Sequence, residues 1–378
     1  MNTKPGLYVH VPFCLKKCHY CDYVITTKRD PSSLAAYFEA LEREIREAIR
    51  RYGPLTFDTL YLGGGTPSAL DGHWMRKLVE LLRREFHFNS EGEWTCEVNP
   101  GDVDAGKLAV YRELGINRIS LGAQTFNDSL LKDMGRLHTA QQTVETVRQA
   151  RQCGFENISL DLMIAIPAQT LEDVREAVRQ TIALNAAQAA VFDLDVADPT
   201  VYGFRRRRGQ LNFPAEELHQ AMMTLIEEDL TRSGYRHYEL TNFARTGFES
   251  RHNLIYWNNR EYLGLGPGAF SYMEGVRYQF SADVNRYLAK CGREDWTRDI
   301  EDRLSPEEKE FETLLTGLRL AEGIDLDHFE IIRRRVEEKA KALTDSGLVE
   351  RRGSRLALTR PGRFLSDRIF SELLEPAA

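Results

Sequence analysis

The chain has 378 residues, of which 42% are hydrophobic and 28% are charged, a composition typical of a globular protein. This excludes a wholly disordered chain, a collagen-like repeat and a coiled coil. Fifty basic and 57 acidic side chains give a net charge of −7, which excludes a globally basic nucleic-acid binder, so we expect no nucleic-acid partner. The length predicts a large α/β body, alone or with a smaller module.

No apolar run approaches the ~20 residues that a membrane helix needs. The N-terminal segment MNTKPGLYVHVPFC lacks the basic stretch and long apolar run of a secretory signal, so we expect a cytoplasmic protein. Six cysteines are too few and too unevenly spaced for a disulfide scaffold.

Six apolar, β-rich runs alternate with charged segments of helical period in the first half of the chain. The predicted strands are 6–11, 57–62, 93–98, 118–122, 157–163 and 189–194, and the predicted helices are near 32–51, 72–85, 103–114, 138–153 and 170–185. This order predicts an α/β fold with a parallel sheet covered by helices, and six units favour an incomplete (βα)6 barrel. The loops after the strands then share one rim, where such folds place their chemistry.

The pattern changes near residue 198, and we expect three segments. Residues 1–197 form the partial barrel, and residues 198–303 form a mixed extension that closes the barrel side. The extension is predicted to hold a helix near 214–233, short strands around 235–243 and a glycine-rich loop at 264–268. Residues 304–378 combine amphipathic helices with two short strands, an order that resembles a small winged-helix module.

The strongest chemical signal is a C-x3-C-x2-C triplet, Cys14, Cys18 and Cys21, directly after the first predicted strand. Three thiolates in one loop can hold three irons of a cubane 4Fe-4S cluster and leave the fourth iron open for a ligand. The alternatives are a zinc site with His10 or His19 as fourth ligand, or incidental free thiols.

This triplet after a first strand resembles the signature of the radical S-adenosylmethionine (SAM) enzymes. The strings YVHVPFC, YLGGGTPS, CEVNPGD, RISLGAQTF, MGRLHT, LDLMIAIPAQT, YELTNFA, SRHNLIYW and YLGLGPGA follow in an order similar to the coproporphyrinogen dehydrogenase group. Within that group the chain most resembles the HemW-type heme chaperones, over nearly its whole length. The resemblance implies a 4Fe-4S cluster and SAM as cofactors and heme as a bound ligand.

Two motifs have a direct physical interpretation as SAM contacts. The glycines of Gly63-Gly64-Gly65-Thr66-Pro67 let a ligand approach the backbone closely, although a tight strand-to-helix turn is the alternative. Glu97 can accept hydrogen bonds from ribose hydroxyls, or it is an ordinary acid at the rim.

The resemblance also implies two sets of SAM contacts. Those on the cluster-bound SAM are Tyr8, Gly64 and Glu97. Those matching a second SAM site are Gly65, Thr66, Gln124, Arg136 and Asp161. Arg136 and Asp161 could instead form a structural ion pair.

Two departures from the related families bear on function. The dehydrogenase has a further cysteine two residues after the triplet, where this chain has Tyr23, and a longer N-terminal arm, which argues against coproporphyrinogen decarboxylation. The stretch VFDLDVADPT lacks a glutamate that the chaperones usually have. Within it, Phe192 is interpreted as core packing and Asp195 as a rim carboxylate near a cofactor.

His252, in the string HNLIYW, is the candidate heme ligand, because neutral imidazole is a common axial ligand and neighbouring aromatic rings offer flat apolar surface. The alternative is a hydrogen-bonded loop histidine among packing aromatics. The four arginines at 205–208 could hold heme propionates or a membrane surface, but a solvated loop is the simpler interpretation.

We therefore predict a heme chaperone that binds a 4Fe-4S cluster, SAM and heme, and delivers heme to acceptor hemoproteins, including membrane hemoproteins. Catalytic turnover is not implied. The alternatives are a class C radical SAM methyltransferase or another porphyrin-modifying radical enzyme and, less favoured, coproporphyrinogen III dehydrogenase.

Overall fold

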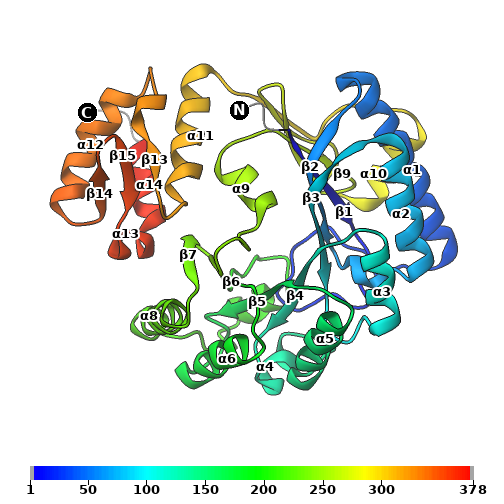
Figure 1. Ribbon diagram of the computed structural model, residues 1–378, viewed down its shortest axis with the longest axis horizontal. Helices are drawn as coiled ribbons and strands as arrows, with labels where there is room; N and C mark the ends of the chain where they lie inside the picture. Colours follow the sequence, from blue (N-terminus) through cyan, green and yellow to red (C-terminus); the bar gives the residue numbers. More distant parts are fainter. Residues whose placement is uncertain (1–3, 375–378) are drawn as a thin grey trace.

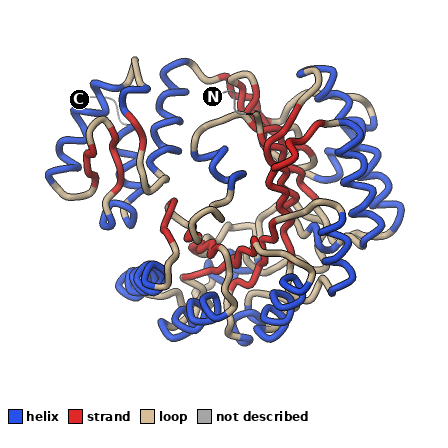
Figure 2. The backbone as a smooth tube through the Cα atoms, viewed as in Figure 1, coloured by secondary structure: helices blue, strands red, loops and turns tan. Residues whose placement is uncertain are grey.

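The computed structural model describes residues 4–374, and its centre is a curved sheet with helices on its outer face (Figures 1 and 2). Six consecutive strands run parallel, which confirms the predicted α/β partial barrel. They are β1 (Gly6–Val11), β2 (Thr56–Gly64), β3 (His87–Val98), β4 (Arg118–Gln124), β5 (Asn157–Ile164) and β6 (Gln188–Asp193).

The helices that connect these strands begin at side chains that cap their first turns. Asp30, for example, accepts a hydrogen bond from the Ser33 amide ahead of α1, and Thr139 and Gln142 form a capping box at α5. The connecting helices are α1 (Pro31–Tyr52), η1 (Pro67–Ala69), α2 (Gly72–Glu85), α3 (Ala105–Glu113), α4 (Asp128–Asp133), α5 (Ala140–Gln152) and α6 (Leu171–Ala183).

Both edges of the sheet are extended by strands from the second half of the chain. Beside β1 lie β9 (Tyr262–Leu265), β10 (Phe270–Met273), β11 (Val276–Gln279) and β12 (Ile300–Arg303), and beside β6 lie β8 (Asn242–Ala244) and β7 (Arg236–Glu239). Within residues 4–374 the outermost strands, β12 and β7, do not pair with each other, so the barrel stays open. The predicted loop 264–268 is wrong at its start, because Gly264 and Leu265 pair in parallel with β1.

Four helices complete the middle of the chain: α7 (Val201–Arg207), α8 (Glu216–Arg232), α9 (Arg251–Trp257) and α10 (Val284–Gly292). Helix α9 lies on the open, concave side of the sheet (Figure 1). The prediction of a loop at 205–208 is wrong, because Arg205–Arg207 end α7 and Arg208 caps it, whereas the predicted solvent exposure is confirmed for Arg206, Arg207 and Arg208. There Arg205 pairs with Asp133 at 2.9 Å, and Arg206 and Arg207 pair with Asp198.

The C-terminal module has its own hydrophobic core and a three-stranded antiparallel sheet. Its elements are α11 (Pro306–Leu318), β13 (Ile324–Asp325), η2 (Leu326–His328), α12 (Arg333–Asp345), β14 (Val349–Arg352), β15 (Arg355–Leu358), α13 (Arg360–Phe364) and α14 (Ser366–Leu374). The outer ends of the first and last predicted segments, 1–3 and 375–378, lie outside the described residues.

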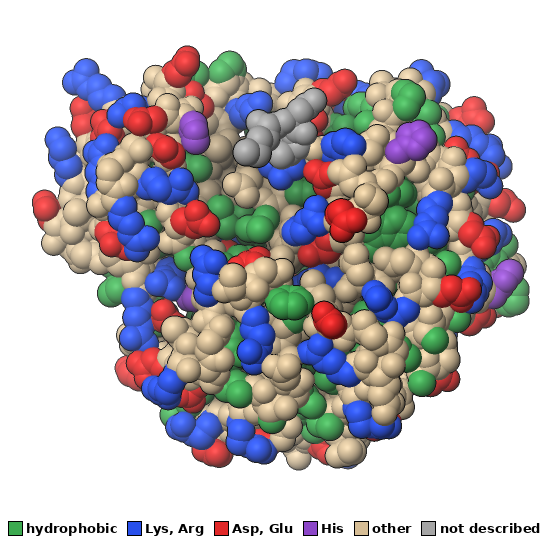
Figure 3. Space-filling model, viewed as in Figure 1, with side chains coloured by type: hydrophobic (Ala, Val, Ile, Leu, Met, Phe, Trp, Pro, Cys, Tyr) green, Lys and Arg blue, Asp and Glu red, His purple; other side chains and the backbone are tan. Residues whose placement is uncertain are grey.

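Between residues 4 and 374 no helix is both long and apolar enough to cross a membrane. Basic and acidic side chains are interspersed over the face shown in Figure 3. Many of them are paired, for instance Arg50 with Glu47 on α1 and Arg84 with Glu42 across α2 and α1.

Candidate functional site

A cavity of about 380 Å³ opens at the carboxyl ends of the parallel strands, where the sequence predicts the site. Alternate residues of a strand point to the same face, so Arg118, Ser120, Gly122 and Gln124 of β4 line the cavity in one row. The cavity contains ten of the twelve predicted site residues: Cys14, Cys18, Cys21, Gly64, Gly65, Thr66, Glu97, Gln124, Arg136 and Asp161.

A chain of polar contacts joins two of the three cysteines. The thiol of Cys14 lies 3.3 Å from Thr66 Oγ1, which accepts from the side-chain amide of Asn99 at 3.1 Å. Asn99 Oδ1 accepts from Arg136, whose other guanidinium nitrogen lies 3.6 Å from Cys18 Sγ. This network fixes the cysteine loop against the ends of β2, β3 and β4 and places a positive charge beside a sulfur.

The donor set fits an iron–sulfur cluster, which cysteine thiolates hold on separate irons. Burial raises the pKa of Cys14 to about 11 and also raises the pKa of Cys21, so iron must displace a proton from each. No group of three His, Cys, Asp or Glu side chains within residues 4–374 is arranged to hold a single metal ion. The two histidines that a zinc site would use are bonded elsewhere, His10 Nε2 to the Val24 carbonyl and His19 Nδ1 to the Asp133 carbonyl.

The glycines after β2 allow the backbone to pass close to β1. Gly64 has φ +106°, and a Cβ there would lie 2.5 Å from the His10 ring. A Cβ on Gly65 would lie 2.7 Å from the Pro12 backbone carbon. These positions therefore require glycine for packing, as a tight turn would, and the resulting loop also exposes backbone to the cavity.

Glu97 and Asp161 place two buried carboxyl groups on the cavity wall. Glu97 accepts from the Tyr61 hydroxyl at 3.0 Å and from the Gly64 amide at 3.1 Å, and Asp161 accepts from Ser120 at 2.9 Å. Burial, followed by the charge of Asp161, raises the pKa of Glu97 to about 7, and burial raises the pKa of Asp161. Each carboxylate oxygen can accept more than one hydrogen bond, so both groups can still receive ligand hydroxyls.

Arg136 and Asp161 do not form the structural ion pair considered as an alternative. The guanidinium of Arg136 donates to the Gly122 carbonyl at 2.9 Å, to Asn99 and to Cys18, whereas Asp161 bonds to serines. Gln124, at the end of β4, has φ +62°, an uncommon conformation for a residue with a side chain. Its side chain therefore reaches the cavity from a strained backbone position.

Two predicted site residues, Tyr8 and His252, do not line the cavity. Tyr8 is packed beneath it, with its hydroxyl 3.1 Å from His10 Nδ1 and its ring 6.0 Å from the ring of Tyr61. His252 is fully buried in α9, and both ring nitrogens are bonded, Nδ1 to Thr59 Oγ1 at 2.7 Å and Nε2 to the Tyr256 hydroxyl at 2.8 Å. An iron at His252 would have to replace one of these bonds.

The cavity also contains residues that sequence reasoning did not select. Asn99 lies two residues after Glu97 in CEVNPGD, and Arg118 is the first residue of RISLGAQTF. Both residues therefore belong to motifs from which other site residues are predicted. Phe192 is 42% exposed and lines the cavity, so its interpretation as core packing is wrong. Asp195 lines the cavity too, as expected of a rim carboxylate.

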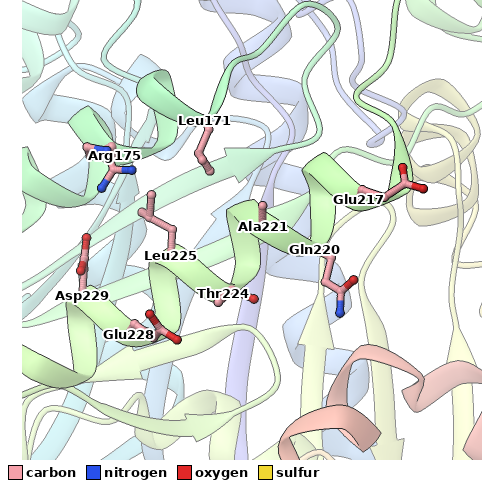
Figure 4. A pocket seen from close by; sticks show the side chains of 9 residues that line it. All are labelled: Leu171, Arg175, Glu217, Gln220, Ala221, Thr224, Leu225, Glu228 and Asp229. Atoms are coloured by element: carbon pink, nitrogen blue, oxygen red, sulfur yellow. The ribbon is translucent and has the colours of Figure 1, made fainter.

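A second hollow, of about 420 Å³, lies between α6 and α8 in the outer helical layer (Figure 4). Its charged side chains are Arg175, Glu217, Glu228 and Asp229. None of the predicted site residues lies there, so the strand-end cavity is the candidate site.

Comparison with known proteins agrees with this geometry. Residues 8–181 match the sequence model of the Radical SAM superfamily, and residues 304–365 match that of the HemN C-terminal domain. The chain is 36% identical to the heme chaperone HemW of Lactococcus lactis, over 99% of this chain and 98% of that protein. It is 34% identical to HemW of Bacillus subtilis, over 97% and 98%.

Among solved structures, the fold resembles coproporphyrinogen III oxidase (HemN) from Escherichia coli, described as a radical SAM enzyme. The TM-score is 0.86 at 23% identity, covering 98% of this chain and 90% of that chain. The partial barrel, the cysteine loop and the matched model define a radical SAM protein, a class that implies a 4Fe-4S cluster and SAM as cofactors. Within that class, the chain belongs to the HemW heme chaperone family.

Proposed function

We propose that this protein is a cytoplasmic heme chaperone that binds a 4Fe-4S cluster, SAM and heme, and passes heme to acceptor hemoproteins, including membrane hemoproteins. The observation that carries the proposal is the gathering of three thiols, the glycine loop and Glu97 around one cavity in a member of the HemW family. All six cysteines are free thiols, which suits a reducing compartment.

In this proposal Cys14, Cys18 and Cys21 hold three irons of the cluster. When bound, the cluster supplies one-electron chemistry and an open iron for SAM. Glu97 accepts from the ribose hydroxyls, and Gly64 presents backbone to SAM, while Tyr8 supports this wall from beneath through His10. Gly65, Thr66, Gln124, Arg136 and Asp161 surround the space for a second SAM.

Two parts of this chain are candidates for binding heme. His252 is neutral at physiological pH, because burial, followed by the charge of Arg118, lowers its pKa to about 3, and a neutral imidazole can ligate iron. Binding there requires α9 to release a bond to Thr59 or Tyr256. The alternative, propionates held by the arginines at 205–208, would compete with their pairing to Asp133 and Asp198.

The test is a hemin titration of anaerobically reconstituted protein, followed at the Soret band, beside a SAM titration with product analysis. His252→Ala should shift the Soret band and speed heme loss, with cluster and SAM binding retained. His87→Ala, an exposed histidine on β3, is the matched control. Neutralising the four arginines should have this effect only if charge and packing dominate the hold on heme.

One outcome would replace the proposal. Wild-type protein that takes up no heme at micromolar concentration, yet cleaves SAM or methylates a small acceptor, is a radical SAM enzyme and not a chaperone. The shared cavity would then be interpreted as a methyltransferase or porphyrin-modifying site.

A further inference from the structure

Arg118 is a buried cation inside the barrel. It is the first residue of β4, it is 2% exposed, and it lines the cavity. Gln124 ends the same strand six residues later, so the guanidinium belongs to the floor of the cavity, roughly 20 Å along the strand from the rim. The cluster cysteines follow the opposite, carboxyl end of β1, so floor and cluster loop lie at different depths.

The hydrogen bonds of Arg118 leave its charge uncompensated. One guanidinium nitrogen donates to Gln188 Oε1 at 3.1 Å, a neutral acceptor, and the buried Nε has no hydrogen-bond partner. Within residues 4–374 no carboxylate lies within ion-pair distance of Arg118. Glu97 and Asp161 interact with it only at longer range and bond to other groups.

An unpaired buried charge is unfavourable by several kcal/mol, so such groups normally have a carboxylate or a bound anion beside them. The direct partner of Arg118 is neutral, and a carboxylate, that of Glu239, enters the network only after Gln188 and Asn242. The Gln188 amide donates to Asn242 Oδ1, and Asn242 donates to Glu239, which fixes the acceptor oxygen of Gln188 toward the guanidinium. The buried Nε therefore has no partner inside the fold, and the guanidinium that lines the cavity is the cation a ligand meets at this floor.

We infer that Arg118 anchors a carboxylate subsite at the floor of the cavity. A planar guanidinium matches a carboxylate with two parallel hydrogen bonds, and exclusion of water strengthens them. The carboxylate has two possible sources, a propionate of a tetrapyrrole or the methionyl carboxylate of a SAM molecule held deeper than the cluster. The inference goes beyond the proposed function, because its SAM arm can be decided without heme.

The test variant is Gln188→Glu, which is isosteric and places a carboxylate where Gln188 Oε1 already accepts from Arg118. The new carboxylate pairs with the Arg118 guanidinium and repels the carboxylate of a ligand. Any cost of the lost donation to Asn242 affects charged and uncharged ligands alike, so it cancels in a ratio of affinities. Gln142→Glu, in the capping box of α5 outside the cavity, controls for the added negative charge.

Two ligand pairs are measured on reconstituted protein. Hemin is compared with hemin dimethyl ester by Soret titration, and SAM is compared with decarboxylated SAM by equilibrium dialysis. Wild type should favour the free acid of at least one pair by about tenfold or more, because a charge-assisted hydrogen bond is worth ~1.5–3 kcal/mol. Gln188→Glu should reduce that ratio by about tenfold, and Gln142→Glu should leave it unchanged.

If Gln188→Glu lowers the preference for hemin over hemin dimethyl ester, the floor binds a propionate. If it lowers the preference for SAM over decarboxylated SAM, the floor binds a methionyl carboxylate. If wild type shows no preference for either free acid, or if Gln188→Glu changes neither ratio, the inference is overturned. If Gln188→Glu does not fold, the second variant is Arg118→Lys, which keeps the positive charge but loses the planar guanidinium that makes two parallel hydrogen bonds. It should also lower the preference for the free acid. Failure to bind hemin at all would instead contradict the proposed function and leave the SAM pair to decide the subsite.

Discussion

The ionisation of the Glu97 carboxyl group should make the stability of the ligand-free protein depend on pH. Its pKa is about 7 in the fold, chiefly through burial and then through Asp161, against about 4.3 in an unfolded chain. As pH rises from 4.5 to 7, the unfolded chain loses this proton before the folded chain does. The contribution of Glu97 is therefore fully present below pH 4.5 and is lost as pH rises through 7.

We expect Glu97→Gln to remove this dependence. The stability of wild type relative to the variant should fall between pH 5 and 7.5 by roughly 1–3 kcal/mol, measured by denaturant unfolding of apo protein at several pH values. Glu145→Gln, whose pKa is lowered to about 2 by Arg148 and Gln149 on the exposed face of α5, is the control and should show no such change over this range. A difference between wild type and Glu97→Gln that stays constant with pH would contradict the assignment.

The three cysteines of the triplet should be necessary for iron, and the other three should not. Replacing Cys14, Cys18 and Cys21 by Ala should lower the iron content after anaerobic reconstitution from about four per chain to near zero and abolish the visible absorption of the cluster. Cys153→Ala is the matched control, because that thiol lies at the end of α5 and bonds only to the Ala105 carbonyl. Full iron incorporation in the triple variant would disprove the cluster assignment.

At this scale the sequence could predict residues whose chemistry is local. The cysteine spacing, the glycine loop and the carboxyl group at the end of β3 were selected from short motifs, and all of them line the cavity. Arg118 was not selected, because an arginine at the start of a strand is normally solvated and only the closed tertiary surroundings bury it. The ring bonds of His252 were equally hidden, because Thr59 lies 193 positions away in the chain.

Among the elements, α9 is held by contacts to strands far from it in sequence. The Glu93 carboxylate at β3 accepts from the Arg251 amide at 3.1 Å and from the His252 amide at 3.0 Å, and Thr59 of β2 bonds to the His252 ring. A carboxylate at a helix N-terminus satisfies amides that have no partner within the helix. These contacts fix the aromatic string HNLIYW against the barrel strands.

Thr59→Val should loosen this attachment. The substitution keeps the shape and leaves the buried Nδ1 of His252 without a partner, which should lower the free energy of unfolding by about 1–3 kcal/mol. Amides of α9 should also exchange hydrogen faster, as measured by mass spectrometry. Thr181→Val is a matched control, because the buried Thr181 hydroxyl donates to a helix carbonyl that needs no second bond, and equal losses in the two variants would argue against a special role for Thr59.

The long elements and several short strands, among them β7, β8, β14 and β15, were predictable, but strand β9 and helix α7 were not. The six parallel strands and the predicted helices have apolar patterns that extend over six or more residues, and they lie within a few positions of their predicted ranges, except that β3 begins six residues earlier, at His87. Strand β9 has four residues, three of them glycine or next to glycine, and exists because its backbone pairs with β1. Helix α7 has seven residues and is stabilised by Thr200, which caps it, and by ion pairs to Asp133 and Asp198.

For the whole molecule, the C-terminal module meets the rest of the chain along a seam in which Glu312 of α11 pairs with Arg277 of β11 at 2.7 Å. Two backbone hydrogen bonds join the residues after α11 to β7 and the turn after β7, from the Leu240 amide to the Arg319 carbonyl and from the Ala321 amide to the Tyr238 carbonyl. Further along, Arg360 and Arg363 of α13 contact Glu227 of α8 at 2.9 and 3.3 Å. The module's hydrophobic core is separate from the barrel's, so the seam depends largely on polar contacts.

Glu227 is the acid that two guanidinium groups of the module share, and reversing its charge should therefore open the seam at α13. An exposed ion pair contributes only about 0–1 kcal/mol, but Glu227 is half-buried. A lysine there would face Arg360, Arg363 and the nearby His237, with only Glu228, which pairs with Arg360 at 3.1 Å, as a counter-charge. We expect Glu227→Lys to speed hydrogen exchange of α13 and α14 amides by about tenfold and to leave the amides of β1–β6 unchanged, because the module keeps its own core. Glu172→Lys reverses an equally charged residue that pairs with Arg175 on α6, away from the seam, and should leave both regions unchanged. Faster exchange throughout the barrel in Glu227→Lys would show that module and barrel unfold as one cooperative unit, and that the polar seam is not where they separate.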